Sequence, residues 1–89
     1  MEIQVLEEEN TKLKFKVIGE THTICSLLKK ELFNDKAVEF AGYNVEHPLI
    51  KEAVFTVSTT KKNARKAVND AISRIKENIS DFQSEIKKI

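Results

Sequence analysis

Apolar residues recur in alternating steps of four and three along the last third of the chain. They are Val68, Ile72, Ile75, Ile79, Phe82, Ile86 and Ile89. This heptad spacing places the side chains on one face of an α-helix. The pattern predicts a helix from about Lys62 to Lys88, roughly 40 Å long, whereas a chain of 89 residues folds into a body about 30 Å across. We therefore expect the helix to extend beyond its own domain, and its apolar stripe to require another chain that covers it.

The two halves of this predicted helix differ in the size of their side chains. The first half carries Ala64, Ala67 and Ala71 beside Val68 and Ile72. Small residues let a backbone approach closely, so we expect the first half to pack on the chain's own sheet. The second half carries larger residues, which we predict to form a partner surface: Ile75, Ile79, Phe82, Ile86 and Ile89.

The N-terminal residues predict two strands, at 2–7 and 11–18. In the second, Leu13, Phe15 and Val17 alternate with lysines at 12, 14 and 16, which is the period of a strand with one apolar face. The polar residues 8–10 join the two strands as a hairpin. Glutamates of the first strand then face lysines of the second, and such pairs help to set the register.

A first helix is predicted after the break at residues 19–23, and it extends to about Phe33. Its apolar face is formed by Ile24, Leu27, Leu28 and Leu32, which are spaced as on one side of a helix. Either Thr21 or Thr23 can cap its N-terminus.

Two further strands are predicted, at 37–46 and 53–60. In the first of them Val38 and Phe40 share one parity, while Tyr43 and Val45 share the other. A β-bulge at Ala41-Gly42 would allow this change of face. The element order is then β-β-α-β-β-α, which predicts a single α+β domain over residues 1–89: a mainly antiparallel four-stranded sheet with two helices on one face.

Composition agrees with a small domain that associates. A chain of this length buries too little surface for a large core, and its single cysteine excludes a disulfide within the chain, which leaves oligomerisation as a source of stability. The acidic N-terminal residues lack the apolar stretch of a signal peptide, and no apolar run is long enough to span a membrane. We expect a cytoplasmic location.

Charge is distributed unevenly, from −4 over residues 1–10 to +4 over residues 61–89. Lys61, Lys62, Arg65 and Lys66 cluster where the long helix begins. A solvated surface and a nucleic-acid patch are the two interpretations of this cluster. We favour the solvated surface, because no aromatic residues interleave with the basic ones as single-strand binding requires.

Few residues are suited to catalysis or to metal binding. His22, Cys25 and His47 are the only soft ligand candidates, whereas zinc takes three or four protein ligands. We expect Cys25 to be a buried thiol, His22 to bond a turn backbone, and His47 to shape a loop or contact a partner. No combination of nucleophile, base and orienting group is evident, so we expect no enzyme site, metal or cofactor in this chain.

Two motifs carry a family resemblance. The first is residues 19–23, Gly-Glu-Thr-His-Thr, which lead into the leucine-rich helix, and the second is residues 38–43, Val-Glu-Phe-Ala-Gly-Tyr, followed by His47-Pro48-Leu49. With them the chain resembles the small alpha-like subunits of multisubunit DNA-directed RNA polymerases, called subunit L in archaea. Departures from the family pattern are mild, such as Thr21 for the usual Asp and Glu46 for a common Pro. The start of the chain at its first strand favours the archaeal form.

The resemblance implies a non-catalytic protein that heterodimerises with a larger alpha-like subunit, called D in archaea. Two small zinc-binding subunits would join this pair to form a platform for the large catalytic subunits, and DNA would be contacted only indirectly. The resemblance places the first helix and the terminal helix at the interface, which would contain Ile24, Leu27, Leu28, Leu32, Ile75, Ile79, Phe82, Ile86 and Ile89.

Two alternatives remain open from the sequence. A free-standing α+β module that associates with itself through the same apolar stripe would form a stable homodimer when expressed alone. A nucleic-acid binder would show a steep salt dependence of its affinity for DNA or RNA.

Overall fold

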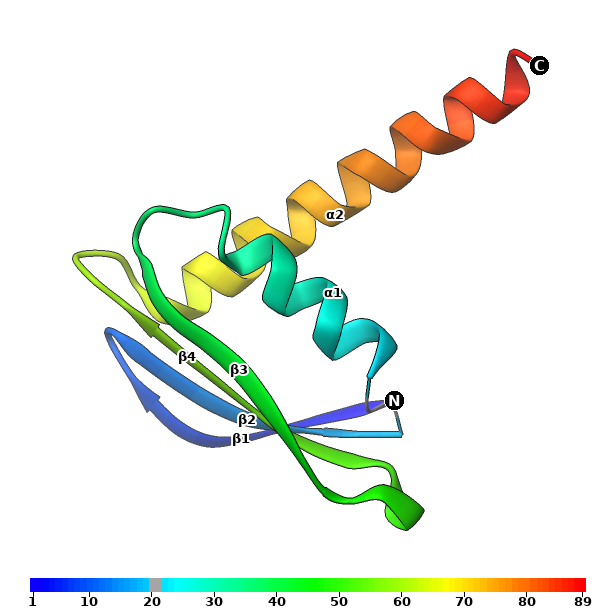
Figure 1. Cartoon of the computed structure of the whole chain (residues 1–89). Helices are drawn as coiled ribbons and strands as arrows, with labels where there is room; N and C mark the ends of the chain where they lie inside the picture. The colour runs from blue at the N-terminus through cyan, green and yellow to red at the C-terminus, as the bar shows by residue number, and fades with distance from the viewer. Residues whose placement is uncertain (20–21) are drawn as a thin grey trace.

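The computed structural model describes residues 1–19 and 22–89, with the side chains of 46–48 outside the description. Its elements follow the predicted order (Figure 1). They are β1 (Glu2–Glu9), β2 (Lys12–Ile18), α1 (Thr23–Leu32), β3 (Val38–His47), the short 3₁₀ turn η1 (Pro48–Ile50), β4 (Glu52–Thr59) and α2 (Ala64–Lys87).

The four strands form one antiparallel sheet in the order β1-β2-β4-β3. Both helices lie on the same face of this sheet, as Figure 1 shows. The helix α1 packs on α2 and β3, while α2 packs on β2 and β4. The predicted α+β architecture is therefore confirmed, down to the shared face of the helices.

The period-two pattern of β2 creates the core. Phe15 lies opposite Val5 on one side and Phe55 on the other, and Phe55 lies opposite Tyr43. The rings of Phe15 and Phe55 stack with centroids 5.3 Å apart, and those of Phe55 and Tyr43 with centroids 6.1 Å apart. One row of aromatic side chains thus crosses the sheet beneath the helices.

The bulge predicted at Ala41-Gly42 is wrong, since both residues pair regularly with β4. The register of β3 instead shifts between Val38 and Phe40, and again between Val45 and His47. The extra residue before Phe40 turns its ring to the exposed face and Ala41 into the core. A Cβ added to Gly42 would lie 3.0 Å from the Phe40 ring, so the absent side chain leaves room for that ring.

The start of α1 also differs from prediction. His22 is the N-cap residue and makes no side-chain cap, and Thr23 is already within the helix. Capping by Thr23 is therefore wrong, and Thr21 lies outside the described residues. The His22 carbonyl accepts the first helical hydrogen bond from the Ser26 N–H, at 2.8 Å.

The helix α2 is anchored at its N-terminus. The Asn63 side chain accepts a hydrogen bond from the Lys66 N–H at 3.0 Å, an ordinary N-cap. The Ala64 N–H donates to the Asn10 carbonyl at 2.8 Å, which ties the helix to the β1–β2 turn. Ala64, Ala67 and Ala71 are fully buried, which confirms that the first half of α2 packs on the sheet.

The second half of α2 projects beyond the sheet (Figure 1). The molecule measures 44 × 37 × 16 Å and has a radius of gyration of 14.1 Å, larger than the ~12 Å expected for a compact chain of this length. The prediction that the helix extends past its own domain is confirmed.

Candidate partner interface

One strand of the sheet, β1, lacks a helical cover on the face that carries the helices. Ile3 and Val5 of β1 pair with Val17 and Phe15 and share their face of the sheet. Their side chains nevertheless remain 52% and 45% exposed, because α1 and α2 pack over the other three strands. Apolar side chains that point toward the core layer are therefore left open to solvent.

These side chains form the floor of an apolar groove with a volume of about 520 Å³. Phe15 and Val17 extend the floor along β2. Ile24 and Leu27 of α1 form one wall, and the other wall is formed by Val68, Ile72, Ile75 and Ile79 of α2. With Phe55 of β4, the groove is lined from five elements.

The apolar face of α2 continues past the groove. Ile79, Phe82, Ile86 and Ile89 are 60%, 69%, 54% and 100% exposed, respectively. We call these four residues the seam. Ile79 belongs to both the groove wall and the seam, so the two surfaces are continuous. Large contiguous apolar surfaces of this kind mark sites of protein association.

The structure distributes the residues predicted for the interface over three environments. Ile24, Leu27, Leu28, Ile75 and Ile79 all line the groove, although Leu28 is also part of the core. Phe82 and Ile86 lie beyond the groove on the second half of α2, and Ile89 follows the end of that helix. Leu32 is fully buried in the chain's own core, apart from both surfaces.

Sequence reasoning missed the contribution of β1. Met1, Ile3 and Val5 line the groove, and the alternation of Ile3 and Val5 in an edge strand was the available signal. The register of the hairpin also shifts at Leu6, which brings Glu8 to the helix side of the sheet opposite Leu13.

A charged pair borders the groove. Arg65 of α2 donates to both carboxylate oxygens of Glu8, from Nε at 2.6 Å and from Nη2 at 2.8 Å. The hydrogen bond from Arg65 holds the pKa of the Glu8 carboxyl below its ordinary value. The pair fastens the start of α2 to β1 at the edge where the groove begins.

Two of the four basic residues at the start of α2 are paired with acidic residues of the chain itself. Arg65 is paired with Glu8, and Lys62 Nζ contacts Asp35 at 2.5 Å and Asp70 at 2.9 Å. Lys61 and Lys66 are exposed. Because Lys62 and Arg65 pair with acidic residues of the chain itself, the contacts favour a structural role for the cluster over a nucleic-acid patch.

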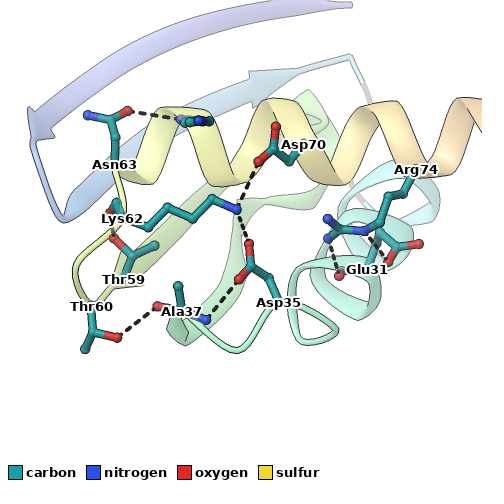
Figure 2. A network of polar contacts seen from close by, with 10 residues as sticks. Glu31, Asp35, Ala37, Thr59, Thr60, Lys62, Asn63, Asp70 and Arg74 are labelled. Carbon is teal, nitrogen blue, oxygen red and sulfur yellow. Dashed lines mark hydrogen bonds and ion pairs between the residues drawn. The ribbon is translucent and has the colours of Figure 1, made fainter.

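Polar contacts join α2 to the end of α1 (Figure 2). Besides its bonds to Lys62, Asp35 accepts from the Ala37 N–H at 2.9 Å. Arg74 donates from Nε to Glu31 Oε2 at 3.1 Å and from Nη2 to the Glu31 carbonyl at 3.2 Å. These contacts lie on the side of the helices where α1 ends.

His22 and Cys25, two of the candidate ligands named from the sequence, contact other parts of the fold. Nδ1 of His22 is hydrogen-bonded to the Tyr43 hydroxyl at 3.2 Å, so its partner is a side chain of β3 rather than the expected turn backbone. Cys25 is buried, as predicted. The His47 side chain lies outside the description. Within residues 1–19 and 22–89, no three His, Cys, Asp or Glu side chains gather as a metal site, and no helix is long and apolar enough to cross a membrane.

A sheet with helices on one face, an open apolar groove and a projecting seam together define an α+β domain built for association with protein. Comparison of the sequence with known protein families identifies the particular domain. The model of the RNA polymerase Rpb3/Rpb11 dimerisation domain matches residues 12–85, and the chain belongs to this family.

Relatives and a solved structure agree with this assignment. DNA-directed RNA polymerase subunit Rpo11 of Sulfolobus acidocaldarius is 39% identical over 90 residues and spans 100% of both chains. Rpo11 of Korarchaeum cryptofilum is 40% identical over 78 residues, which cover 86% of this chain and 80% of the relative. The crystal structure of RNA polymerase subunit L from Thermoplasma acidophilum shares the fold, with a TM-score of 0.87 at 21% identity over 98% of this chain and 86% of that one. The resemblance stated from the two motifs is confirmed.

Proposed function

We propose that this chain is a non-catalytic assembly subunit of a DNA-directed RNA polymerase, and that it heterodimerises with the larger alpha-like subunit of the same enzyme. The continuous apolar surface of groove and seam carries the proposal. It lies on a domain whose family is described as a dimerisation domain and whose relatives are polymerase subunits.

The groove and the seam suggest how the heterodimer forms. The groove can receive one helix, and the seam of α2 can enter a matching groove on the partner. Burying one large apolar side chain stabilises a complex by about 1.5–3 kcal/mol. The four exposed residues of the seam, together with Ile24 and Leu27 at the groove, can therefore supply the core of a stable interface.

The remaining partners follow from the same assignment. The heterodimer would join the small zinc-binding subunits and support the large catalytic subunits, which would perform nucleotide addition in the cytoplasm. DNA would reach this chain only indirectly. The pairing of Lys62 and Arg65 with acidic residues of the chain itself supports this last point.

Co-expression with the candidate larger alpha-like subunit tests the heterodimer. We expect a 1:1 complex in size-exclusion chromatography, and we expect the complex to be lost when the chain is truncated after Ile75, because the seam is then absent. The matched control is Ser84→Ala, which changes α2 on the face opposite Phe82 and should leave the complex intact.

Two outcomes would contradict the proposal. Undiminished binding of the truncated chain would remove the seam from the interface. The full-length chain could also elute as a clean homodimer and not bind the larger subunit. This result would favour the self-associating module, which would use the same groove and seam.

A further inference from the structure

The second half of α2 projects from the body, so a small change in the direction of this helix produces a large displacement at its end. The helix is anchored through its first half, and Ile75 is the last of its residues that packs against the core. From Arg74 to Ile86 the helix runs for twelve residues, which is about 18 Å at 1.5 Å per residue. A change of about ten degrees in the direction of α2 would move Ile86 by about 3 Å. Such a displacement is large for side chains that must interdigitate at the density of a protein interior.

Arg74 holds the helix at the point where it leaves the body. Its guanidinium bonds both the carboxylate and the backbone carbonyl of Glu31, near the C-terminus of α1. The planar fork of an arginine fixes direction as well as distance. Glu31 is itself held by the Asn34 side-chain amide, which donates to its carboxylate at 2.8 Å. Figure 2 shows Arg74 reaching across to Glu31 from α2.

A second contact holds the same helix closer to its start. Lys62 precedes α2 and bridges Asp70 on α2 and Asp35 in the segment that follows α1. The Lys62 carbonyl also accepts a hydrogen bond from the Thr59 hydroxyl at the end of β4. The buried alanines and the Arg65–Glu8 pair hold the first half of α2 against the sheet. The contacts of Asp70 and Arg74 add two polar points of attachment on the side of α1.

The carboxylates of Glu31 and Asp35 are the most covered side chains in these contacts. The exposed fractions are 11% for Glu31 and for Asp35, 25% for Lys62, 36% for Arg74 and 41% for Asp70. Water competes less for covered pairs than for exposed ones, so they hold geometry better. The Lys88–Glu85 pair at the far end of α2 differs, since both side chains are 72% exposed and both belong to the end of that helix.

We propose that Arg74 and Glu31, supported by Lys62, Asp35 and Asp70, are positioning residues of the partner interface. They set the angle at which the free half of α2 leaves the body, and so present the seam in the orientation that the partner subunit requires. The effect on partner affinity rests on the proposed function. The effect on the angle of α2 belongs to the isolated chain and does not depend on it.

Single-molecule fluorescence energy transfer reports a change of the angle as a change of the distance between a dye on the sheet and a dye on the second half of α2. The full-length chain would carry dyes through Asn44→Cys on β3 and Ser84→Cys on α2, both at exposed positions, while Cys25 is buried and stays unlabelled. Sub-nanomolar concentration excludes self-association. We expect Arg74→Gln to shift and broaden the transfer-efficiency distribution, and Lys88→Gln to leave it unchanged. An unaltered distribution for Arg74→Gln would overturn the proposal.

Partner affinity supplies the second readout. We expect Arg74→Gln to weaken binding to the larger alpha-like subunit by about tenfold, and Arg74→Lys, which keeps a cationic donor toward the two oxygens of Glu31, to lose less. Val57→Ala serves as the control for stability, since it lowers the stability of the core without touching either contact. If Val57→Ala weakens binding as much as Arg74→Gln, or if Arg74→Lys loses as much as Arg74→Gln, positioning is contradicted.

The two proposals fail in different ways. Ile79→Glu should abolish binding while leaving the energy-transfer distribution as in the unmodified chain. If the unmodified chain does not bind the larger subunit, the proposed function fails, and the energy-transfer measurement alone decides whether Arg74 sets the angle of α2.

Discussion

At the scale of single residues, Asp35 connects three parts of the fold. It lies after α1, accepts from the backbone of Ala37, and pairs with Lys62 ahead of α2. The hydrogen bond from Lys62, followed by that from the Ala37 N–H, holds the pKa of Asp35 below its ordinary 3.8. Bonds to Asp35 and Asp70 raise the pKa of Lys62 above its ordinary 10.5.

This environment predicts a pH-dependent contribution to stability. The folded pKa of Asp35 is depressed, so its contribution is fully present above pH 3.8 and is lost as the pH falls through the lower folded value. Asp35→Asn should lower the free energy of unfolding by about 1–3 kcal/mol near neutral pH, because Lys62 loses a charged partner. Urea denaturation near pH 7 and near pH 3 checks this. If the difference in the free energy of unfolding between Asp35→Asn and the unmodified chain is the same at both pH values, the pH-dependent contribution of Asp35 is contradicted.

Contacts at this scale were largely beyond prediction from the sequence. Asp35 and Lys62 are 27 residues apart, and charged residues make up 33% of the chain, so no local pattern selects one pair from the many possible. His22 illustrates the same limit. Its partner, Tyr43, lies on a strand that approaches α1 only in the folded sheet.

At the scale of elements, α2 divides into two halves with different neighbours. Its buried face consists of three alanines and Val68, which lets the helix lie close to β2 and β4. Its free half has large residues on the same face. One continuous apolar stripe therefore serves the chain's own core first and an outside surface afterwards.

The small residues on the buried face of α2 predict that the stability of the fold depends strongly on side-chain volume at these positions. Ala67→Leu should destabilise the fold by about 1–3 kcal/mol, because the added atoms have no space between α2 and the sheet. Ser73→Leu on the exposed side of the same helix is the matched control. Its effect on the midpoint of urea denaturation should be slight, and an equal effect of the two substitutions would contradict close packing at Ala67.

Periodicity identified the helices and strands but not their irregularities. Alternation in β2 and heptad spacing in α2 are strong signals, because each repeats over a whole element. The bulges of β3 were misplaced because Val38, Phe40 and Tyr43 are all apolar, so apolar character alone does not tell which of them faces the core. The cap of α1 was misassigned for a related reason, since several polar residues in succession could each begin a helix.

At the scale of the whole molecule, the layers do not match in area. Four strands offer a wider face than the two helices cover, and β1 with its Ile3 and Val5 is left open. Sequence reasoning predicted that a partner was needed, because the length of α2 could be compared with the size of the domain. The groove itself was missed, since it appears only when the lateral position of the helices over the sheet is known.

The exposed surface predicts the effect of substitutions on assembly. Phe82→Ala should weaken binding to the larger alpha-like subunit by about tenfold or more, because a buried aromatic anchor contributes well over 1 kcal/mol to an interface. Isothermal titration calorimetry measures the affinity of Phe82→Ala for the larger subunit, and Ser84→Ala serves as the control. Equal affinities of the two variants would contradict a role of Phe82 in the interface.

The uncovered strand β1 and the exposed seam also have a consequence for the cell. A copy of this chain without its partner displays the kind of apolar surface that chaperones and proteases recognise, and such molecules are continuously sorted between rescue and degradation. A paired copy hides that surface. The abundance of this chain would therefore follow the abundance of its partner, and surplus copies would be removed without a dedicated regulator.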